Sequence, residues 1–185
     1  MKRIISVNVG TPIKIARNKD GKIYSGIFKT PVEGPVIVRK LDLDGDRQAD
    51  LSVHGGVNKA VYVYPSEHYE FWRRKFPNMK MNWGTFGENF TTEGLLEREI
   101  HIGDHLIIGS AKFEVTEPRF PCFKLGIKFD DKTMIKLFLE SERSGYYLKV
   151  LNEGQVEAGN AIRRVHSNQN LETITSIVRK VKSDE

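Results

Sequence analysis

The chain has 185 residues, 39% of them hydrophobic and 29% charged, which suits one globular domain with a buried core. No apolar run approaches the roughly 18 residues that a membrane helix needs, and a single cysteine excludes an internal disulfide framework. The N-terminal residues show no signal-peptide pattern, so we expect a cytoplasmic protein with no membrane partner.

The net charge of +5 and the pI near 9.2 are compatible with nucleic acid or with an anionic small ligand. The cations are scattered along the chain, and no basic block alternates with aromatic residues. We therefore favour a solvated basic surface and expect no nucleic-acid partner. A phosphate-bearing small molecule would use the same charge.

The first third of the chain is rich in strand signals. Ile5, Val7 and Val9 alternate with Ser6 and Asn8, which predicts a half-buried strand. An Asn-Lys-Asp-Gly turn then predicts a hairpin between two further strands, because its last residues tolerate positive φ. Another short strand is expected over residues 36–38.

A glycine loop follows a predicted strand over residues 48–53. The loop is His54-Gly55-Gly56, and a strand over 60–64 comes after it. Glycines in such a loop let backbone N–H groups approach a ligand closely. Most loops of this kind are simply turns, so this motif alone is weak.

Three helices are predicted between and after the strands. Apolar residues recur at helical spacing in each, and Pro or Gly ends the first two. The helices run from Ser66 to about Phe76 with Tyr69 and Trp72 inward, from Asp131 or Thr133 to Ser144 with Met134, Leu137 and Phe138 inward, and from Asn170 with Leu171, Ile174, Val178 and Val181 inward.

Three more short strands are expected at 146–151, 155–158 and 161–165. Many short strands with turn glycines and few helices favour a β-barrel. A parallel α/β sheet would need helices that alternate with strands. We therefore predict a mainly β fold with a few peripheral helices, consisting of a barrel domain over 1–166 and a short C-terminal helical appendage over 167–185.

The most reactive candidate side chain is Cys122. Pro121 cannot donate to a strand ladder, so the chain is expected to leave regular pairing just before the thiol. Arg119 and Lys124 would favour the thiolate if their side chains turn toward it. A thiolate is both a soft metal ligand and a nucleophile. The residues leave open that Cys122 is a buried structural cysteine.

A zinc site is not expected, because the histidines show no metal-ligand spacing with Cys122. A Cys-His hydrolase with His54 as base is conceivable but has no support from spacing. The loop over 86–91 holds Glu88, Asn89 and Thr91 on a backbone that can bend tightly. It suits a polar heterocycle or a phosphate, although Asn89 and Thr91 could equally stabilise their own turn.

Several short motifs occur in a fixed order over roughly residues 1–166: Gly45-Asp46, Gln48-Ala49-Asp50, His54-Gly55-Gly56, Lys59-Ala60-Val61-Tyr62, Phe86-Gly87-Glu88-Asn89-Phe90-Thr91, Gly94-Leu95, Ile102-Gly103-Asp104 and Pro118-Arg119-Phe120-Pro121-Cys122. This set resembles the molybdenum cofactor sulfurase C-terminal (MOSC) domain family, and within it the stand-alone bacterial YiiM-like proteins. Each motif alone is modest, but their order is specific.

The resemblance implies a MOSC-type β-barrel with a cleft for molybdenum cofactor (molybdopterin), and we expect no pyridoxal phosphate. It implies that Cys122 either ligates molybdenum or carries a persulfide. The chemistry of the matching loops nominates Glu88 or His54 as the catalytic proton donor. The residues that we would place around the cofactor in these loops are Gly55, Lys59, Gly87, Asn89, Thr91 and Arg119.

The YiiM-like branch is associated with reduction of N-hydroxylated bases such as 6-hydroxylaminopurine. We therefore expect a molybdenum-cofactor-dependent oxidoreductase that acts on a small N-hydroxylated substrate, as a monomer or homodimer. No flavin, haem or iron–sulfur motif is present, so electrons are expected from an external reductase.

Two alternatives remain. One is a sulfur-carrier or cofactor-binding protein that holds a persulfide on Cys122 without reductase turnover. The other is a basic nucleic-acid-binding barrel. YiiM-like proteins commonly carry a three-helix module after the barrel, and here only Asn170–Lys182 could belong to one.

Overall fold

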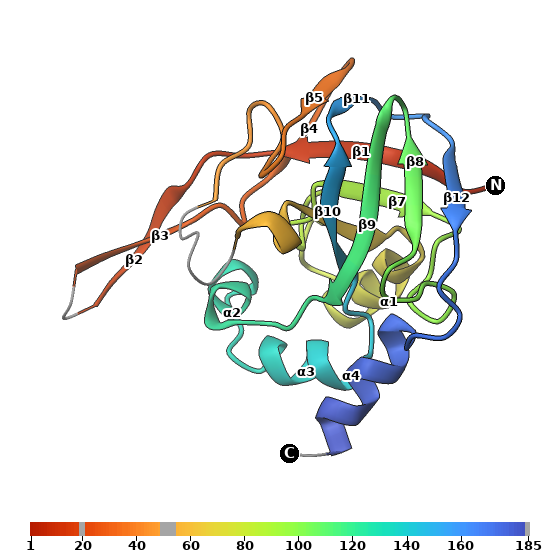
Figure 1. Cartoon of the computed structure of the whole chain (residues 1–185). Coiled ribbons are helices and arrows are strands. Elements are labelled where there is room, and N and C mark those ends of the chain that lie inside the picture. The colour runs from red at the N-terminus through yellow and green to blue at the C-terminus, as the bar shows by residue number, and fades with distance from the viewer. Residues whose placement is uncertain (19–20, 49–54, 184–185) are drawn as a thin grey trace.

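The computed structural model describes residues 1–18, 21–48 and 55–183. Figure 1 shows a strongly curved sheet with helices gathered at one end of it. The mainly β architecture with a few peripheral helices is confirmed. The elements are β1 Arg3–Val9, β2 Ile13–Asn18, β3 Gly21–Ser25, β4 Thr30–Val32, β5 Val36–Val38, η1 Val57–Lys59, β6 Val61–Pro65, α1 Glu67–Lys75, β7 Phe90–Glu93, β8 His105–Ile108, β9 Ala111–Pro118, α2 Phe123–Phe129, α3 Met134–Glu140, β10 Tyr146–Asn152, β11 Gly154–Val156, β12 Ile162–His166 and α4 Ile174–Ser183.

Eight strands form the main sheet in the order β12-β8-β9-β10-β6-β7-β1-β4. The pairs are antiparallel except β6 and β7, which are parallel. The sheet bends back on itself, because the chain at the start of β12 bonds to the chain at the start of β1, next to the far edge. The Ile4 amide donates to the Asn160 carbonyl at 2.9 Å, and the Ile162 amide donates to the Lys2 carbonyl at 2.9 Å. The strands that the structure describes form a curved, open sheet and no closed barrel, so the predicted barrel itself is not confirmed.

Two hydrophobic cores fill the molecule. The first lies inside the curved sheet and takes in residues from β1 to β12 together with Ile174 of α4. The second is rich in aromatic rings and lies where β6 meets α1, α2 and α3. Trp72 and Phe86 are fully buried there, and Trp72 Nε1 donates to the Tyr64 hydroxyl at 2.7 Å. The second core carries the helices that border the pocket described below.

The expected alternation of β1 is wrong in its burial pattern. Ile4 and Val7 are buried, but so are the polar Ser6 and Asn8. A register shift against β7 between Ile4 and Ser6 breaks the period of two. Asn8 remains inside because its side chain donates to the Thr91 hydroxyl at 3.1 Å and its neighbour Ser6 donates to Asn8 at 2.8 Å.

The predicted hairpin is confirmed in its strands. Strands β2 and β3 pair antiparallel, from Ile13 opposite Ser25 to Asn18 opposite Gly21, and Figure 1 shows this ribbon projecting from the body. Its turn residues 19–20 lie outside the described residues. The strand predicted over 48–53 also lies outside them, except for Gln48.

The first two predicted helices are confirmed as α1 and α3, although α3 ends at Glu140 and not at Ser144. Helix α2 was not among the predicted helices. It forms because Leu125 and Phe129, four residues apart, both pack into the second core. It ends at Asp130, which takes a left-handed conformation with φ 50° and donates its amide to the Gly126 and Ile127 carbonyls.

The C-terminal helix begins later than predicted, at Ile174 and not at Asn170. Leu171 is exposed, and the main chain before the helix is drawn toward His101 by a bridge to Thr173. The Thr173 hydroxyl then accepts the Ser176 amide at 3.1 Å, as an N-cap side chain does. None of the helices that the structure describes is long and apolar enough to cross a bilayer.

Candidate functional site

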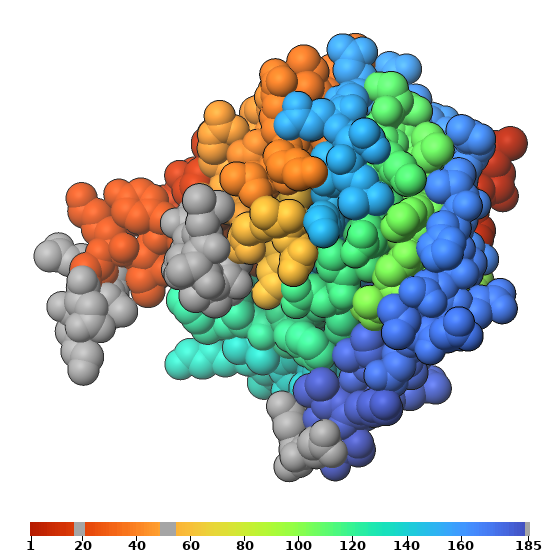
Figure 2. All heavy atoms as spheres, in the orientation of Figure 1, coloured from red at the N-terminus to blue at the C-terminus, as the bar shows by residue number. Residues whose placement is uncertain are grey.

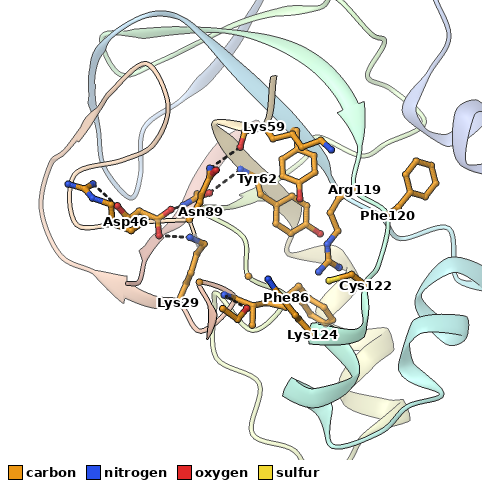
Figure 3. Close-up of a pocket in the computed structure, with 17 residues that line it drawn as sticks. Lys29, Asp46, Lys59, Tyr62, Phe86, Asn89, Arg119, Phe120, Cys122 and Lys124 are labelled. Atoms are coloured by element: carbon orange, nitrogen blue, oxygen red, sulfur yellow. Dashed lines mark hydrogen bonds and ion pairs between the residues drawn. The ribbon is translucent and has the colours of Figure 1, made fainter. Parts of the chain in front are cut away.

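A pocket opens where four loops and η1 meet beside the second core. Its walls come from the segment after β3, the segment around residue 46, the loop before β7, and the loop that joins β9 to α2. Figure 3 shows Arg119, Cys122 and Lys124 on one side of this pocket and Lys29, Asp46 and Asn89 on the other. Residues far apart in the sequence are therefore brought to one small volume.

Cys122 reaches the pocket because the chain leaves β9 just before it. Pro118 is the last β9 residue paired with β10, opposite Tyr146. Pro121 then restricts the chain just before the thiol, and Cys122 itself is extended, with φ −130° and ψ 170°, at the start of α2. Its carbonyl accepts the Leu125 amide at 2.9 Å, which fixes the thiol at the turn into the helix. The thiol is half-buried.

Arg119 is a buried cation beside this thiol. Its residue is only 6% exposed, and its guanidinium lies 5.4 Å from the centre of the Tyr62 ring and 4.9 Å from that of Phe138. Figure 3 shows the guanidinium directed toward the sulfur of Cys122. Burial by itself would lower the pKa of Arg119, but Tyr62, Tyr147 and Cys122 around it raise the pKa above its usual value.

Arg119 also has an unused donor. Its Nη1 is buried and has no hydrogen-bond partner, and among the described residues no carboxylate forms an ion pair with it. A buried N–H that is left unpaired costs about 1–3 kcal/mol. An anionic or carbonyl-bearing ligand in the pocket would remove that cost, so the geometry favours binding of such a ligand here.

The pocket wall is positively charged overall. Among the described lining residues, one acid, Asp46, faces five cations, which are Lys29, Arg47, Lys59, Arg119 and Lys124. Lys29 forms a buried ion pair with Asp46. Burial lowers the pKa of Lys29, while the charge of Asp46 and its hydrogen bond oppose this shift. The excess of cations favours a ligand that carries negative charge.

Asn89 and Gly87 line the pocket and also hold its wall together. The Asn89 side chain accepts a hydrogen bond from the Tyr62 amide at 3.0 Å and donates one to Asp46 at 2.8 Å. It thereby joins β6 to the segment around Asp46. Gly87 has φ 83°, and a Cβ there would lie 2.7 Å from the Ile27 side chain. Glycine therefore allows two lining loops to touch.

Glu88 lies behind the wall and does not line the pocket. It is fully buried and accepts four hydrogen bonds, from the Tyr69 and Thr91 hydroxyls and from the amides of Gly84 and Phe86. Burial, followed by the charge of Glu88, raises the pKa of Tyr69 well above its usual range, which keeps the phenol a donor. Thr91 belongs to the same network.

The structure thus brings together five of the predicted site residues. Cys122, Lys59, Gly87, Asn89 and Arg119 line the pocket. Glu88, Thr91 and Gly55 do not line it, and His54 lies outside the described residues.

Lining residues that were not predicted as site residues include Lys29, Asp46, Tyr62 and Tyr147. Asp46 and Tyr62 stand within the motifs of the family resemblance, so those motifs could have indicated them. No local pattern indicates Lys29, because its partner Asp46 is 17 residues away.

The donor set bears on which metal the pocket suits. Within the described residues no three His, Cys, Asp or Glu side chains gather as a metal site. Cys122 is the one cysteine of the chain. A metal that needs three or four protein ligands therefore has no such cluster in the described part of the chain. A metal that arrives with most of its ligands on an anionic cofactor needs only one protein thiolate, and the unpaired Arg119 donor beside Cys122 fits that kind of group.

Comparisons with known proteins identify the family of the chain and its fold. A model of the MOSC domain family matches residues 50–163. The Bacillus subtilis protein YflK, described as uncharacterized, is 41% identical over 157 residues, which are 84% of this chain and 70% of YflK. A protein of Gibberella moniliformis named "Reductase" is 35% identical over 145 residues, 77% of this chain but only 26% of that protein. The crystal structure of YiiM from Geobacillus stearothermophilus superposes with a TM-score of 0.81 at 32% identity, covering 100% of this chain and 85% of that one.

Proposed function

Because this chain belongs to the MOSC domain family, we propose that it holds a molybdenum cofactor in the pocket around Cys122 and reduces small N-hydroxylated molecules. The fungal relative named "Reductase" supports the reaction class. The observation that carries the proposal is the pairing of Cys122 with the buried Arg119, whose Nη1 has no partner.

In this proposal Cys122 would be the thiolate ligand of the metal, and the cations around it would hold the negative charge of the cofactor. Arg119 would direct Nη1 at a phosphate or pterin oxygen, and Lys59 and Lys124 would add charge at the same wall. When bound, the cofactor supplies the two-electron redox chemistry. The rings of Tyr62 and Phe138 hold the Arg119 guanidinium in place and exclude water from one side of it.

Protons must reach the leaving oxygen of the N–OH group. The sequence suggested Glu88 or His54 for this role, but the four hydrogen bonds of Glu88 suit it to hold the loop. We propose that Lys29 Nζ holds the proton, since this residue lines the pocket beside Asp46. Burial lowers its pKa, which makes the ammonium a better acid.

The experiment that tests this function measures molybdenum and pterin in protein purified without oxygen from cells that make the cofactor. We expect near-stoichiometric metal in the wild type and loss of metal in Cys122→Ala. Lys136→Ala, with a side chain 80% exposed, is the matched control and should keep the metal. Loaded wild type should reduce 6-hydroxylaminopurine with a chemical reductant, and Cys122→Ala should not.

Absence of metal from the wild type under cofactor-replete expression would defeat the reductase proposal. In that case mass spectrometry of the intact protein would show whether Cys122 carries a persulfide, which is the sulfur-carrier alternative.

A further inference from the structure

A second buried carboxylate, that of Glu97, lies outside the lining of the pocket. Glu97 is only 3% exposed and accepts a hydrogen bond from the Gly145 amide at 2.7 Å. His68 Nε2 lies 2.9 Å and 2.8 Å from its two carboxylate oxygens. His68 is its ion-pair partner among the described residues, and no Lys or Arg of that part of the chain pairs with it.

The pair of His68 and Glu97 joins α1 to the loop after β7. Its side chains are 11% and 4% exposed. A buried ion pair is often no more stabilising than apolar residues of the same volume, because both groups lose their hydration. What such a pair does provide is a fixed geometry. Here it fixes the oxygen that the Gly145 amide meets.

The segment Ser144–Gly145 carries this geometry to Arg119. The Gly145 carbonyl accepts the Arg119 amide at 3.3 Å. The Ser144 carbonyl accepts the Tyr62 hydroxyl at 2.8 Å. Tyr62 is one of the two rings against which the Arg119 guanidinium packs. Two neighbouring residues therefore hold both the main chain of Arg119 and a ring beside its charged group.

Gly145 also touches β6 so closely that it has no room to shift alone. It has φ 63°, and a Cβ there would lie 2.3 Å from the Val63 carbonyl oxygen and 2.8 Å from the Tyr62 ring. A displacement of Gly145 would therefore move Tyr62 as well. Loss of the bond to Glu97 would be felt at the guanidinium of Arg119.

We propose that Glu97, held by His68, is a positioning residue for Arg119. By fixing Ser144–Gly145 it directs the guanidinium toward Cys122, as Figure 3 shows it. The consequence for cofactor binding rests on the proposed function. The position of the guanidinium beside the thiol does not, so the two can be tested separately.

The test measures alkylation of Cys122 in the full chain without cofactor. Cys122 is the single cysteine, so no other thiol reacts. Iodoacetate is negatively charged and iodoacetamide is neutral, and both are attacked by the same thiolate. The ratio of their rate constants therefore reports the charge beside the sulfur and not the fraction of thiolate. Arg119→Met gives the ratio in the absence of the guanidinium.

Asp104→Ala is the matched control. Asp104 is 0% exposed, and neither it nor any of its partners lines the pocket. Its carboxylate accepts hydrogen bonds from the His101 amide, the Asn168 amide and Arg164 Nη1. In Figure 2 the blue chain of β12, which carries Arg164, lies along the side of the molecule away from the gold residues of η1 at the pocket.

We expect Glu97→Ala to lower the ratio of iodoacetate to iodoacetamide about fivefold, to the value of Arg119→Met. Glu97→Gln should keep the wild-type ratio, because its amide oxygen can accept the Gly145 amide and its N–H can be accepted by a neutral His68. Asp104→Ala should lower the melting temperature but keep the ratio. In cells that make the cofactor, Glu97→Ala should retain less molybdenum than Asp104→Ala.

An unchanged ratio in Glu97→Ala would overturn the positioning role, as would an equal fall in Asp104→Ala, which would mean general loosening of the fold. Equal ratios in the wild type and Arg119→Met would also overturn it. Should Glu97→Ala not fold, Glu97→Asp, which withdraws the carboxylate by one methylene, takes its place with the same expected direction. The expected ratios in a protein that never binds molybdenum would support the positioning role and defeat the proposed function.

Discussion

Two ionisable side chains at the pocket wall, Glu88 and Arg119, are both almost completely hidden from water but are bonded very differently. Glu88, behind the wall, is 0% exposed and accepts four hydrogen bonds. Arg119, in the wall, is 6% exposed, keeps one donor without a partner and has aromatic rings around it in place of a carboxylate among the described residues.

The difference separates a group whose hydrogen-bonding capacity is used within the fold from one that keeps a donor to spare. A buried polar group normally finds partners within the fold, because an unpaired one costs free energy. Glu88 meets this requirement completely, so its chemistry is already used in holding the loop from Gly84 to Thr91. Arg119 does not, which leaves its donor available to a ligand. A comparison of burial alone would not have distinguished Glu88 from Arg119.

The largest effect on stability is expected at Glu88. Glu88→Ala would leave the Tyr69 and Thr91 hydroxyls and two buried amides without their acceptor. The free energy of unfolding should fall by about 4 kcal/mol, and the melting temperature by roughly 10 °C. Urea unfolding followed by tryptophan fluorescence would measure this change. Glu88→Gln, which keeps one acceptor oxygen, should lose less, and a loss below about 1 kcal/mol in Glu88→Ala would break the comparison.

An effect of intermediate size on the free energy of unfolding is expected at Lys128, and it should depend on pH. Its Nζ donates to the Ile27 carbonyl at 2.6 Å and the Gly84 carbonyl at 3.0 Å, so it ties α2 to both lining loops. Burial, helped by Lys29 and Arg119, lowers its pKa to about 8 from 10.5. Between about pH 8 and 10.5 the Lys128 side chain binds more protons in the unfolded chain than in the folded one. The contribution of Lys128 to the free energy of unfolding therefore rises with pH.

The measurement is the unfolding free energy of the wild type and of Lys128→Met from about pH 8 toward 10.5. The difference between the two proteins should grow in favour of the wild type as pH rises, because the wild type sheds an unfavourable buried charge. A constant difference over this window would show that Lys128 keeps its ordinary pKa.

The smallest effect on stability is expected at Arg119, despite its burial. Arg119→Met places an apolar chain between Tyr62 and Phe138 and removes a buried charge, so stability should change by less than about 1 kcal/mol. Its cofactor content should nevertheless fall strongly. Arg119→Lys keeps the charge but not the two-pronged donor geometry and should recover only part of the binding. A large loss of stability in Arg119→Met with full cofactor retained would reverse the roles assigned to Arg119 and Glu88.

Much of the fold was predictable from local patterns. The periods of α1 and α3, the hairpin strands and the short strands after residue 145 depend on neighbouring residues, and the structure has them. Helix α2 and the burial pattern of β1 were missed. In both cases distant partners decide the outcome: Leu125 and Phe129 need the second core, and Asn8 needs Thr91.

The sequence by itself determined that a lone cysteine follows a strand and two prolines, with cations close by and a tightly turning loop elsewhere. These features depend on residue type and spacing, and they were enough to indicate Cys122, Arg119 and Asn89. Only the tertiary structure decided which of two buried charges has partners. Hydrogen bonds such as that from Asn89 to Asp46, 43 residues apart, are formed when loops meet, and no local pattern contains them.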